Sequence, residues 1–87
     1  MKNWADYSFI IRSENRKRVF ELLEKPQIPT NLAEQLQLNL GYVSNILISL
    51  IDRGLVKCLN PGEKRHRLYV MTEKGNKIMK GLIQEKK

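Results

Sequence analysis

The chain has 87 residues, of which 41% are hydrophobic, and it carries a formal net charge of +7. This length allows one domain, residues 1–87, and excludes a second; its core would be small, so oligomerisation would help to stabilise it. No apolar run approaches the roughly 18 residues of a membrane span, which excludes a membrane-spanning protein. Residues 1–11 lack the order of a signal peptide, so we expect a cytoplasmic protein without a membrane partner.

Residues that carry catalysis or bind metals are scarce. Cys58 and His66 are the single cysteine and the single histidine, so a disulfide within one chain is impossible and a zinc site from one chain is disfavoured. We find no Ser–His–Asp set, no Gly-rich phosphate loop and no acid/base pair, and therefore expect neither an enzyme nor a cofactor. Cys58 is interpreted as a small core residue of a hairpin, with a redox switch as the alternative. His66 is either an ordinary loop residue or a group that titrates near neutral pH.

The first expected elements are helical. Residues 4–11 are aromatic and apolar, and predict a short helix or turn that packs on the domain or on a second subunit. Ser13 is expected to cap a helix over about 13–25. The expected inward side chains of that helix are Val19, Phe20, Leu22 and Leu23. Its basic residues fit either a solvated charged face or a phosphate contact: Arg16, Lys17 and Arg18.

Two prolines separate this helix from the next one. Pro26 is expected to end the first helix, and Pro29 to prevent another from starting before Thr30. Thr30 would then cap a short helix over about 31–37. The intervening Gln27 and Ile28 are expected to be extended and could join a small sheet.

Residues 39–54 contain the pattern around which the rest of the chain is organised. Apolar residues recur there at steps of three and four, which predicts a helix over about 40–53 with one buried stripe. Asn39 is the expected N-cap, and Gly54 suits a left-handed C-terminal cap. The expected buried stripe comprises Val43, Ile46, Leu47, Leu50 and Ile51. The other face carries short polar groups, which suit a helix that enters a DNA groove and contacts base edges: Ser44, Asn45, Ser49 and Asp52.

The last third of the chain predicts a hairpin and carries most of the charge. Residues 55–59 and 67–71 read as strands, and the Asn-Pro-Gly sequence at 60–62 predicts a turn between them. Thr72 is expected to cap a final helix over about 73–86. Its expected apolar side comprises Ile78, Met79, Leu82 and Ile83. Residues 55–87 hold nine basic and three acidic residues, whereas residues 1–54 hold seven and six. A basic domain of this size most often binds nucleic acid, and an anionic membrane surface is the other common partner.

Helix, short turn, helix and a hairpin with a basic loop is the order of a winged helix-turn-helix. The apolar and small residues that this motif needs are Leu32, Ala33, Leu36, Leu38, Val43 and Ile46, with Ala33 small enough for a close helix crossing. From about Phe9 to Gly75 the chain resembles the winged-helix repressors of the arsenical-resistance and multiple-antibiotic-resistance types. The resembling segments are 13–23, 31–36, 42–47, 52–56 and 71–75. The resemblance implies a mainly α fold with a small β-hairpin: a three-helix core plus a wing and an extra terminal helix.

The same resemblance implies a DNA-binding surface. In those families the second helix of the motif lies in the major groove, and the wing reaches the backbone or the adjacent minor groove. The implied contact residues are Thr30, Asn39, Leu40, Gly41, Tyr42, Ser44, Asn45 and Ser49, with Lys64, Arg65, His66 and Arg67 in the wing at 60–67. Asn45 can pair bidentately with adenine, and the basic residues of the wing can neutralise phosphates.

Some features depart from the family pattern. Leu40 stands where a more polar residue is usual, Asn45 where Arg or His is common, and Gln37 where many helix-turn-helix turns have glycine. The paired cysteines of metal-sensing members are missing, so metal sensing is not implied.

The expected function is sequence-specific binding of double-stranded DNA by a small transcriptional regulator. We expect a homodimer on a palindromic site, formed through residues 1–12 and 72–87. Alternatively, both ends cover only their own core. The alternative functions are a winged-helix protein-interaction module in a larger assembly and a nonspecific architectural DNA binder.

Overall fold

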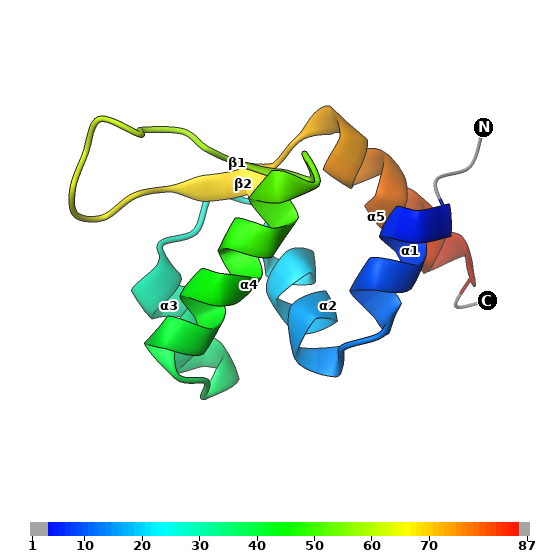
Figure 1. The fold of residues 1–87 in the computed structure, drawn as a ribbon, viewed down its shortest axis with the longest axis horizontal. Helices are drawn as coiled ribbons and strands as arrows, with labels where there is room; N and C mark the ends of the chain where they lie inside the picture. Colours follow the sequence, from blue (N-terminus) through cyan, green and yellow to red (C-terminus); the bar gives the residue numbers. More distant parts are fainter. Residues whose placement is uncertain (1–3, 86–87) are drawn as a thin grey trace.

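The computed structural model describes the backbone of residues 4–85 and the side chains through residue 82. Figure 1 shows the order of its elements. The helices are α1 (Trp4–Ile11), α2 (Glu14–Leu22), α3 (Pro29–Leu36), α4 (Leu40–Asp52) and α5 (Glu73–Glu85), and the strands are β1 (Val56–Cys58) and β2 (Tyr69–Met71). The expected mainly α fold with one small hairpin is confirmed. Within the described part of the chain, no helix is long and apolar enough to cross a membrane.

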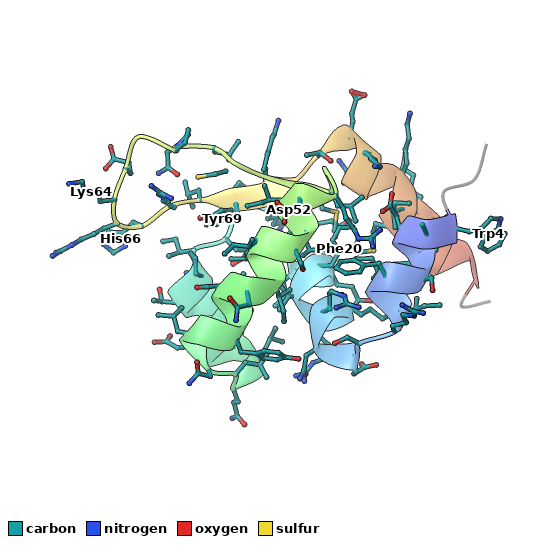
Figure 2. The ribbon with its side chains drawn as sticks, viewed as in Figure 1. Trp4, Phe20, Asp52, Lys64, His66 and Tyr69 are labelled. Atoms are coloured by element: carbon teal, nitrogen blue, oxygen red, sulfur yellow. The ribbon has the colours of Figure 1, made fainter. Side chains whose placement is uncertain are left out.

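The core is built from aliphatic side chains around one buried aromatic ring. Phe20 of α2 is fully buried at its centre (Figure 2). Burial of each large apolar side chain contributes roughly 1.5–3 kcal/mol. The other large, fully buried side chains come from four helices, the segments beside them and β1: Ile10, Val19, Leu23, Leu32, Val43, Leu50, Leu55 and Val56. Ile78, Met79 and Leu82 of α5 are also buried, as expected. The expectation that Ile83 shares this apolar side falls outside the side chains that the structure describes.

Both predicted ends of α4 are confirmed. The Asn39 side chain accepts hydrogen bonds from the backbone N–H groups of Gly41 and Tyr42, at 2.7 and 3.3 Å. Gly54 has a φ of 75°, and its N–H donates to the carbonyl of Ile51 while the N–H of Leu55 donates to that of Leu50. These two bonds form a Schellman cap, for which glycine is the favoured residue because it lacks a Cβ.

The buried stripe of α4 is narrower than its sequence pattern predicts. Val43, Ile46, Leu47 and Leu50 are buried, but Ile51 is 38% exposed. Neighbouring elements cover only an arc of the helix, and Ile51 lies beyond the edge of that arc. The expectation that Ile51 belongs to the core is therefore wrong.

The start of α3 also differs from expectation. The helix begins at Pro29 itself, with Ile28 as N-cap and no side-chain cap bond. Proline suits the first helical position because its φ is already helical and the missing N–H has no partner there. Pro29 therefore initiates the helix that it was expected to delay, and Thr30 is not its cap.

The turn between α3 and α4 depends on a strained residue. Gln37 has a φ of 56°, and its N–H and that of Leu38 donate to the carbonyls of Glu34 and Ala33. This is again a Schellman cap, with glutamine in the left-handed position that glycine occupies at lower cost.

The wing is joined to the helical body by a third extended segment. β1 and β2 pair antiparallel, with Cys58 opposite Tyr69. Gln27 adds an isolated bridge to Tyr69, in which each backbone N–H donates to the other residue's carbonyl at 2.9 Å. The extended conformation expected at Gln27 is confirmed, and it holds the base of the wing beside the start of α3.

The hairpin, α4 and α5 meet at Thr72. Its hydroxyl accepts from the Gly75 N–H at 3.1 Å and donates to the Gly54 carbonyl at 2.6 Å, which confirms the predicted cap. A Cβ at Gly75 would clash with the Leu55 carbonyl, so glycine is needed for the close approach of α5 to the hairpin.

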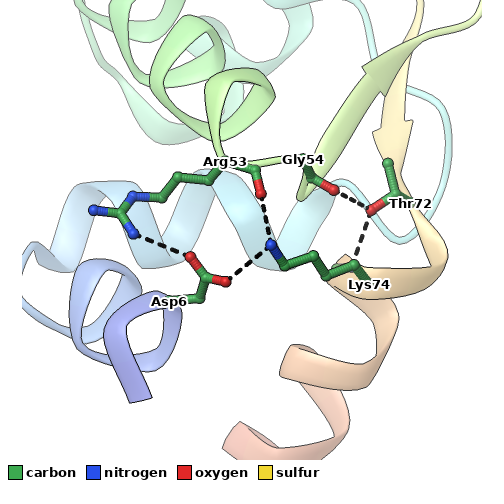
Figure 3. A network of polar contacts seen from close by, with 6 residues as sticks. Asp6, Arg53, Gly54, Thr72 and Lys74 are labelled. Carbon is green, nitrogen blue, oxygen red and sulfur yellow. Dashed lines mark hydrogen bonds and ion pairs between the residues drawn. The ribbon is translucent and has the colours of Figure 1, made fainter. Parts of the chain in front are cut away.

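One buried carboxylate links α1, α4 and α5 (Figure 3). Asp6 of α1 is 4% exposed. Its Oδ1 accepts from Nη1 of Arg53 at 3.0 Å, and its Oδ2 lies 3.2 Å from Nζ of Lys74. Lys74 also donates to the Arg53 carbonyl at 3.0 Å. The C-terminal end of α4 is thus tied to both terminal helices.

We expect Asp6→Asn to lower the free energy of unfolding by about 1–3 kcal/mol, because an amide cannot replace a buried carboxylate that serves two cations. Urea denaturation measures the change. Asp52→Asn, at an exposed position on α4, is the matched control and should change stability by less than about 0.5 kcal/mol. Equal effects of the two substitutions would show that the network contributes nothing.

We expect Gln37→Gly to raise the free energy of unfolding by about 0.5–1 kcal/mol, because it relieves the left-handed strain. Gln35→Gly, within α3, should instead destabilise by about 1 kcal/mol. Thermal unfolding of both variants provides the test, and destabilisation by both would rule out a left-handed Gln37.

Candidate nucleic-acid interface

The exposed face of α4 is almost uncharged. Gly41 and Asn45 are exposed, Ser44 is half-buried, and Asp52 at the far end contributes the one acidic side chain of this helix. Ile48 lies in the middle of this face and is 56% exposed. Sequence reasoning missed Ile48, although its spacing of three from Asn45 and four from Ser44 places all of them on one face.

The wing presents its basic side chains to solvent. Lys64, Arg65, His66 and Arg67 are all exposed, and Figure 2 shows Lys64 and His66 at the tip, away from the helices. His66 has a φ of 56°, an uncommon conformation that bends the loop at this point.

Asn60 holds the two arms of the wing together. Its Oδ1 accepts from the Leu68 N–H at 2.7 Å and from the Cys58 thiol at 3.7 Å, and its Nδ2 donates to the His66 carbonyl at 3.3 Å. Arg67 donates through Nε to the Glu63 carbonyl at 2.6 Å. The basic loop is therefore ordered by its own hydrogen bonds, and the half-buried Cys58 thiol participates in them.

A cleft of about 500 Å³ lies between the wing, the start of α3 and the start of α4. Ile28, Pro29 and Tyr69 supply its apolar lining. It also brings together seven of the twelve predicted site residues: Thr30, Leu40, Ser44, Lys64, Arg65, His66 and Arg67. Residues separated by more than 30 positions in sequence thus form one surface of mixed apolar and basic character.

The other predicted residues lie on or beside α4, outside this cleft. Asn39 uses its side-chain oxygen in the helix cap, whereas Gly41, Tyr42 and Asn45 are exposed. Ser49 is half-buried, and its hydroxyl donates to the Ile46 carbonyl at 2.7 Å. Asn45 is therefore the amide on this face whose donors and acceptor are open to solvent.

Cations also gather on the side of α4 away from the wing, where α2 packs against α4 and α1 packs against α2 (Figure 1). The guanidinium groups of Arg16 and Arg53 lie over the ring of Phe9, with Cζ 3.8 and 4.0 Å from its centroid. Burial lowers the pKa of Arg16 from its usual value, but a guanidinium remains protonated at neutral pH. Sequence reasoning noted the basic run at 16–18 but could not place Arg53 beside Arg16, because this depends on the packing of Phe9 of α1 against both arginines.

The described residues contain no group of three or more His, Cys, Asp or Glu side chains that could hold a metal ion. The surface formed by α4, the wing and the neighbouring arginines offers hydrogen-bonding, apolar and cationic groups. Such a surface suits recognition of a polyanion.

Comparisons with known proteins agree with this geometry. A family model described as winged helix-turn-helix matches residues 17–87. No curated protein sequence matches the chain significantly.

Solved structures with the same architecture include regulators of two kinds. The MarR family transcription regulator SP03579 superposes with a TM-score of 0.75 at 22% identity, over 94% of this chain and 59% of that protein. The homodimeric winged helix-turn-helix DNA-binding domain of Mb0332 from Mycobacterium bovis, a possible ArsR-family transcriptional regulator, gives 0.72 at 21% identity, over 92% and 73%. RV1404 from Mycobacterium tuberculosis gives 0.75 at 16% identity, over 92% and 58%. The chain thus spans less than two thirds of two of these three proteins, and at these identities the likeness establishes the fold.

The resemblance inferred from residues 9–75 is confirmed at the level of architecture by regulators of both types. The family model covers the helix-turn-helix, the wing and the last helix. This chain belongs to the winged helix-turn-helix family.

Proposed function

We propose that this protein is a transcriptional regulator that binds double-stranded DNA sequence-specifically. In this proposal α4 lies in the major groove, and the wing at 60–67 contacts the backbone or the adjacent minor groove. The observation that carries it is the uncharged, exposed face of α4 beside a basic wing, with residues of both lining one cleft.

The dimensions and chemistry of α4 suit a major groove. The helix has 13 residues, a length of about 20 Å, and the groove is about 12 Å wide, which admits a helix. Short side chains at Gly41 and Ser44 permit close approach to base edges. Asn45 can pair with adenine, and Leu40 and Ile48 can contact thymine methyl groups.

The wing provides charge without sequence information. Lys64, Arg65 and Arg67 are exposed cations on an ordered loop, so each can neutralise a phosphate and release counterions. Because the charge lies on the wing and the base contacts lie on α4, we expect the wing to make affinity depend on salt concentration. We expect α4 to determine the preference for particular base pairs.

We further propose that residues 1–12 and 72–87 form a two-fold dimer interface. The inner faces of α1 and α5 cover their own core through Ile10 and Leu82, but Trp4 and Ile11 of α1 remain 63% and 54% exposed. The related fold of Mb0332 is described as homodimeric. Two copies of α4 would then contact half-sites about 34 Å apart on a palindromic site. Residues 1–3 and 86–87 of these segments lie outside the described structure.

A protein-interaction module is the second candidate, and one observation favours it. Ile48 and Ile51 on α4 and Leu59 beside β1 expose apolar surface, which a protein partner could cover. Retention of a stoichiometric protein partner, with no preference among DNA duplexes, would support this candidate over the first.

We expect Asn45→Ala to relax the preference for one base pair by about 1–3 kcal/mol, because the bidentate amide contact is lost. Arg65→Ala should weaken all duplexes alike and lower the salt dependence. Selection of bound fragments from a random duplex pool, followed by affinity measurements, distinguishes the two effects. A wild-type protein that enriches no sequence would refute specific regulation.

We expect Ile48 to recognise a thymine methyl. Replacing one thymine at a time by uracil removes only that methyl group, and at one position the wild type should lose a few-fold in affinity. The Ile48→Ala variant should lose nothing further at that position, whereas Gln35→Ala, at an exposed position on α3, should behave as the wild type. Equal losses for wild type and Ile48→Ala at every position would exclude the contact.

A further inference from the structure

Two arginines are held side by side on the edge of α4 that faces away from the wing. The guanidinium groups of Arg16 and Arg53 both lie over the Phe9 ring, within 4.0 Å of its centroid. Arg16 also donates through Nε to the Phe9 carbonyl at 2.6 Å. This contact orders a long side chain that would otherwise lose rotamer entropy when it binds a ligand.

The charge gathered there is only partly neutralised within the fold. Burial is the main cause that lowers the pKa of Arg16, and the like charges of Arg53 and of Arg12, which directly follows α1, lower this pKa further. Asp6 pairs with Arg53, but it divides its charge between Arg53 and Lys74 (Figure 3). Arg12 and Arg16 take part in neither of these pairs. Holding like charges together costs free energy, which an anionic partner would offset.

The position of this cluster relative to α4 indicates which anion it would bind. Leu40 and Ser44 line the cleft with the wing, whereas the exposed Tyr42, two positions from each, lies on the other side of α4. There α2, which carries Arg16, packs against α4 (Figure 1), and Arg53 directly follows α4. The uncharged face of α4 therefore has cations along both edges. A major groove likewise has a neutral floor of base edges between two strands of phosphates.

We propose that Arg12, Arg16 and Tyr42 form a second phosphate-binding site, which contacts the DNA strand opposite the one that the wing contacts. Arg53 and Phe9 position Arg16 for this contact. The proposal rests on the proposed function. It assigns phosphate binding to the start of the basic run at 16–18, for which the sequence alone allows either a solvated charged face or a phosphate contact.

The slope of affinity against salt concentration tests this site. Binding of the full chain to its selected duplex is measured by fluorescence anisotropy over a series of salt concentrations. Each lost phosphate contact lowers the slope of log K against log salt by about 0.9, so Arg12→Gln and Arg16→Gln should each lower it by about that amount. Lys25→Gln removes the same charge from an exposed position after α2 and should leave the slope unchanged. Slopes for Arg12→Gln and Arg16→Gln that equal that of Lys25→Gln would overturn the proposal.

Neutral methylphosphonates placed singly along the duplex locate the contact. Wild-type protein should lose affinity at positions on both strands bordering the groove. At one or two of these positions, the methylphosphonate should not weaken the binding of Arg12→Gln. These positions should lie on the strand where methylphosphonates still weaken the binding of Arg65→Gln. If Arg12→Gln and Arg65→Gln lose sensitivity at the same positions, the two-strand arrangement is wrong. Arg12 is exposed, so its variant remains informative even if Arg16→Gln melts at a lower temperature. Because Arg12 ends the segment proposed to dimerise, light scattering of Arg12→Gln separates a lost phosphate contact from a lost dimer.

The outcomes also separate this inference from the function on which it rests. If the wild type binds all duplexes equally, specific regulation fails, yet a lower slope confined to Arg12→Gln and Arg16→Gln would still establish a phosphate site. If the wild type is specific and both slopes are unchanged, regulation stands and the second site does not exist.

Discussion

The rotation of α4 about its own axis is the constraint on which the remaining geometry depends. Val43, Ile46, Leu47 and Leu50 are buried, and rotating the helix would expose aliphatic surface worth roughly 25 cal/mol per Å². Because successive residues of a helix are separated by a fixed angle, burial of these four also determines which residues are exposed. The same hydrophobic energy that stabilises the fold therefore presents Asn45 and Ile48 to solvent.

Polar contacts then fix the ends of the helix that hydrophobic burial orients. Asn39 and Gly54 determine where α4 starts and stops, and Asp6 ties its C-terminal end to α1 and α5 through Arg53. If α1 and α5 form the proposed dimer interface, this carboxylate joins the interface directly to the helix proposed to read DNA. The spacing of two reading helices would then depend on one buried ion-pair network.

Charge and base-reading groups occupy different elements. The exposed face of α4 offers amide, hydroxyl and aliphatic groups, whereas cations come from the wing and from Arg12, Arg16 and Arg53. A long flexible cation on α4 itself could contact phosphates in many registers. Placing cations at its edges leaves short side chains of limited reach facing the base edges, which favours sequence preference over simple attraction.

Local chemistry made much of this fold predictable. The caps at Ser13, Asn39 and Thr72 were predictable because each depends on a hydroxyl or amide reaching an N–H no more than three residues away. Local reasoning failed at Pro29, since proline disrupts the interior of a helix but suits its first position.

By itself, the sequence determined the helix starts after Ser13, Asn39 and Thr72, the hairpin and the basic wing, because these depend on neighbours within a few residues. Only the tertiary structure decided that Ile51 is exposed, that Asp6 meets Arg53 across 47 positions, and that Arg16 and Arg53 share the ring of Phe9. Such contacts arise where α1 packs against α2 and meets Arg53 at the C-terminal end of α4, and no local pattern specifies which faces of separate helices meet.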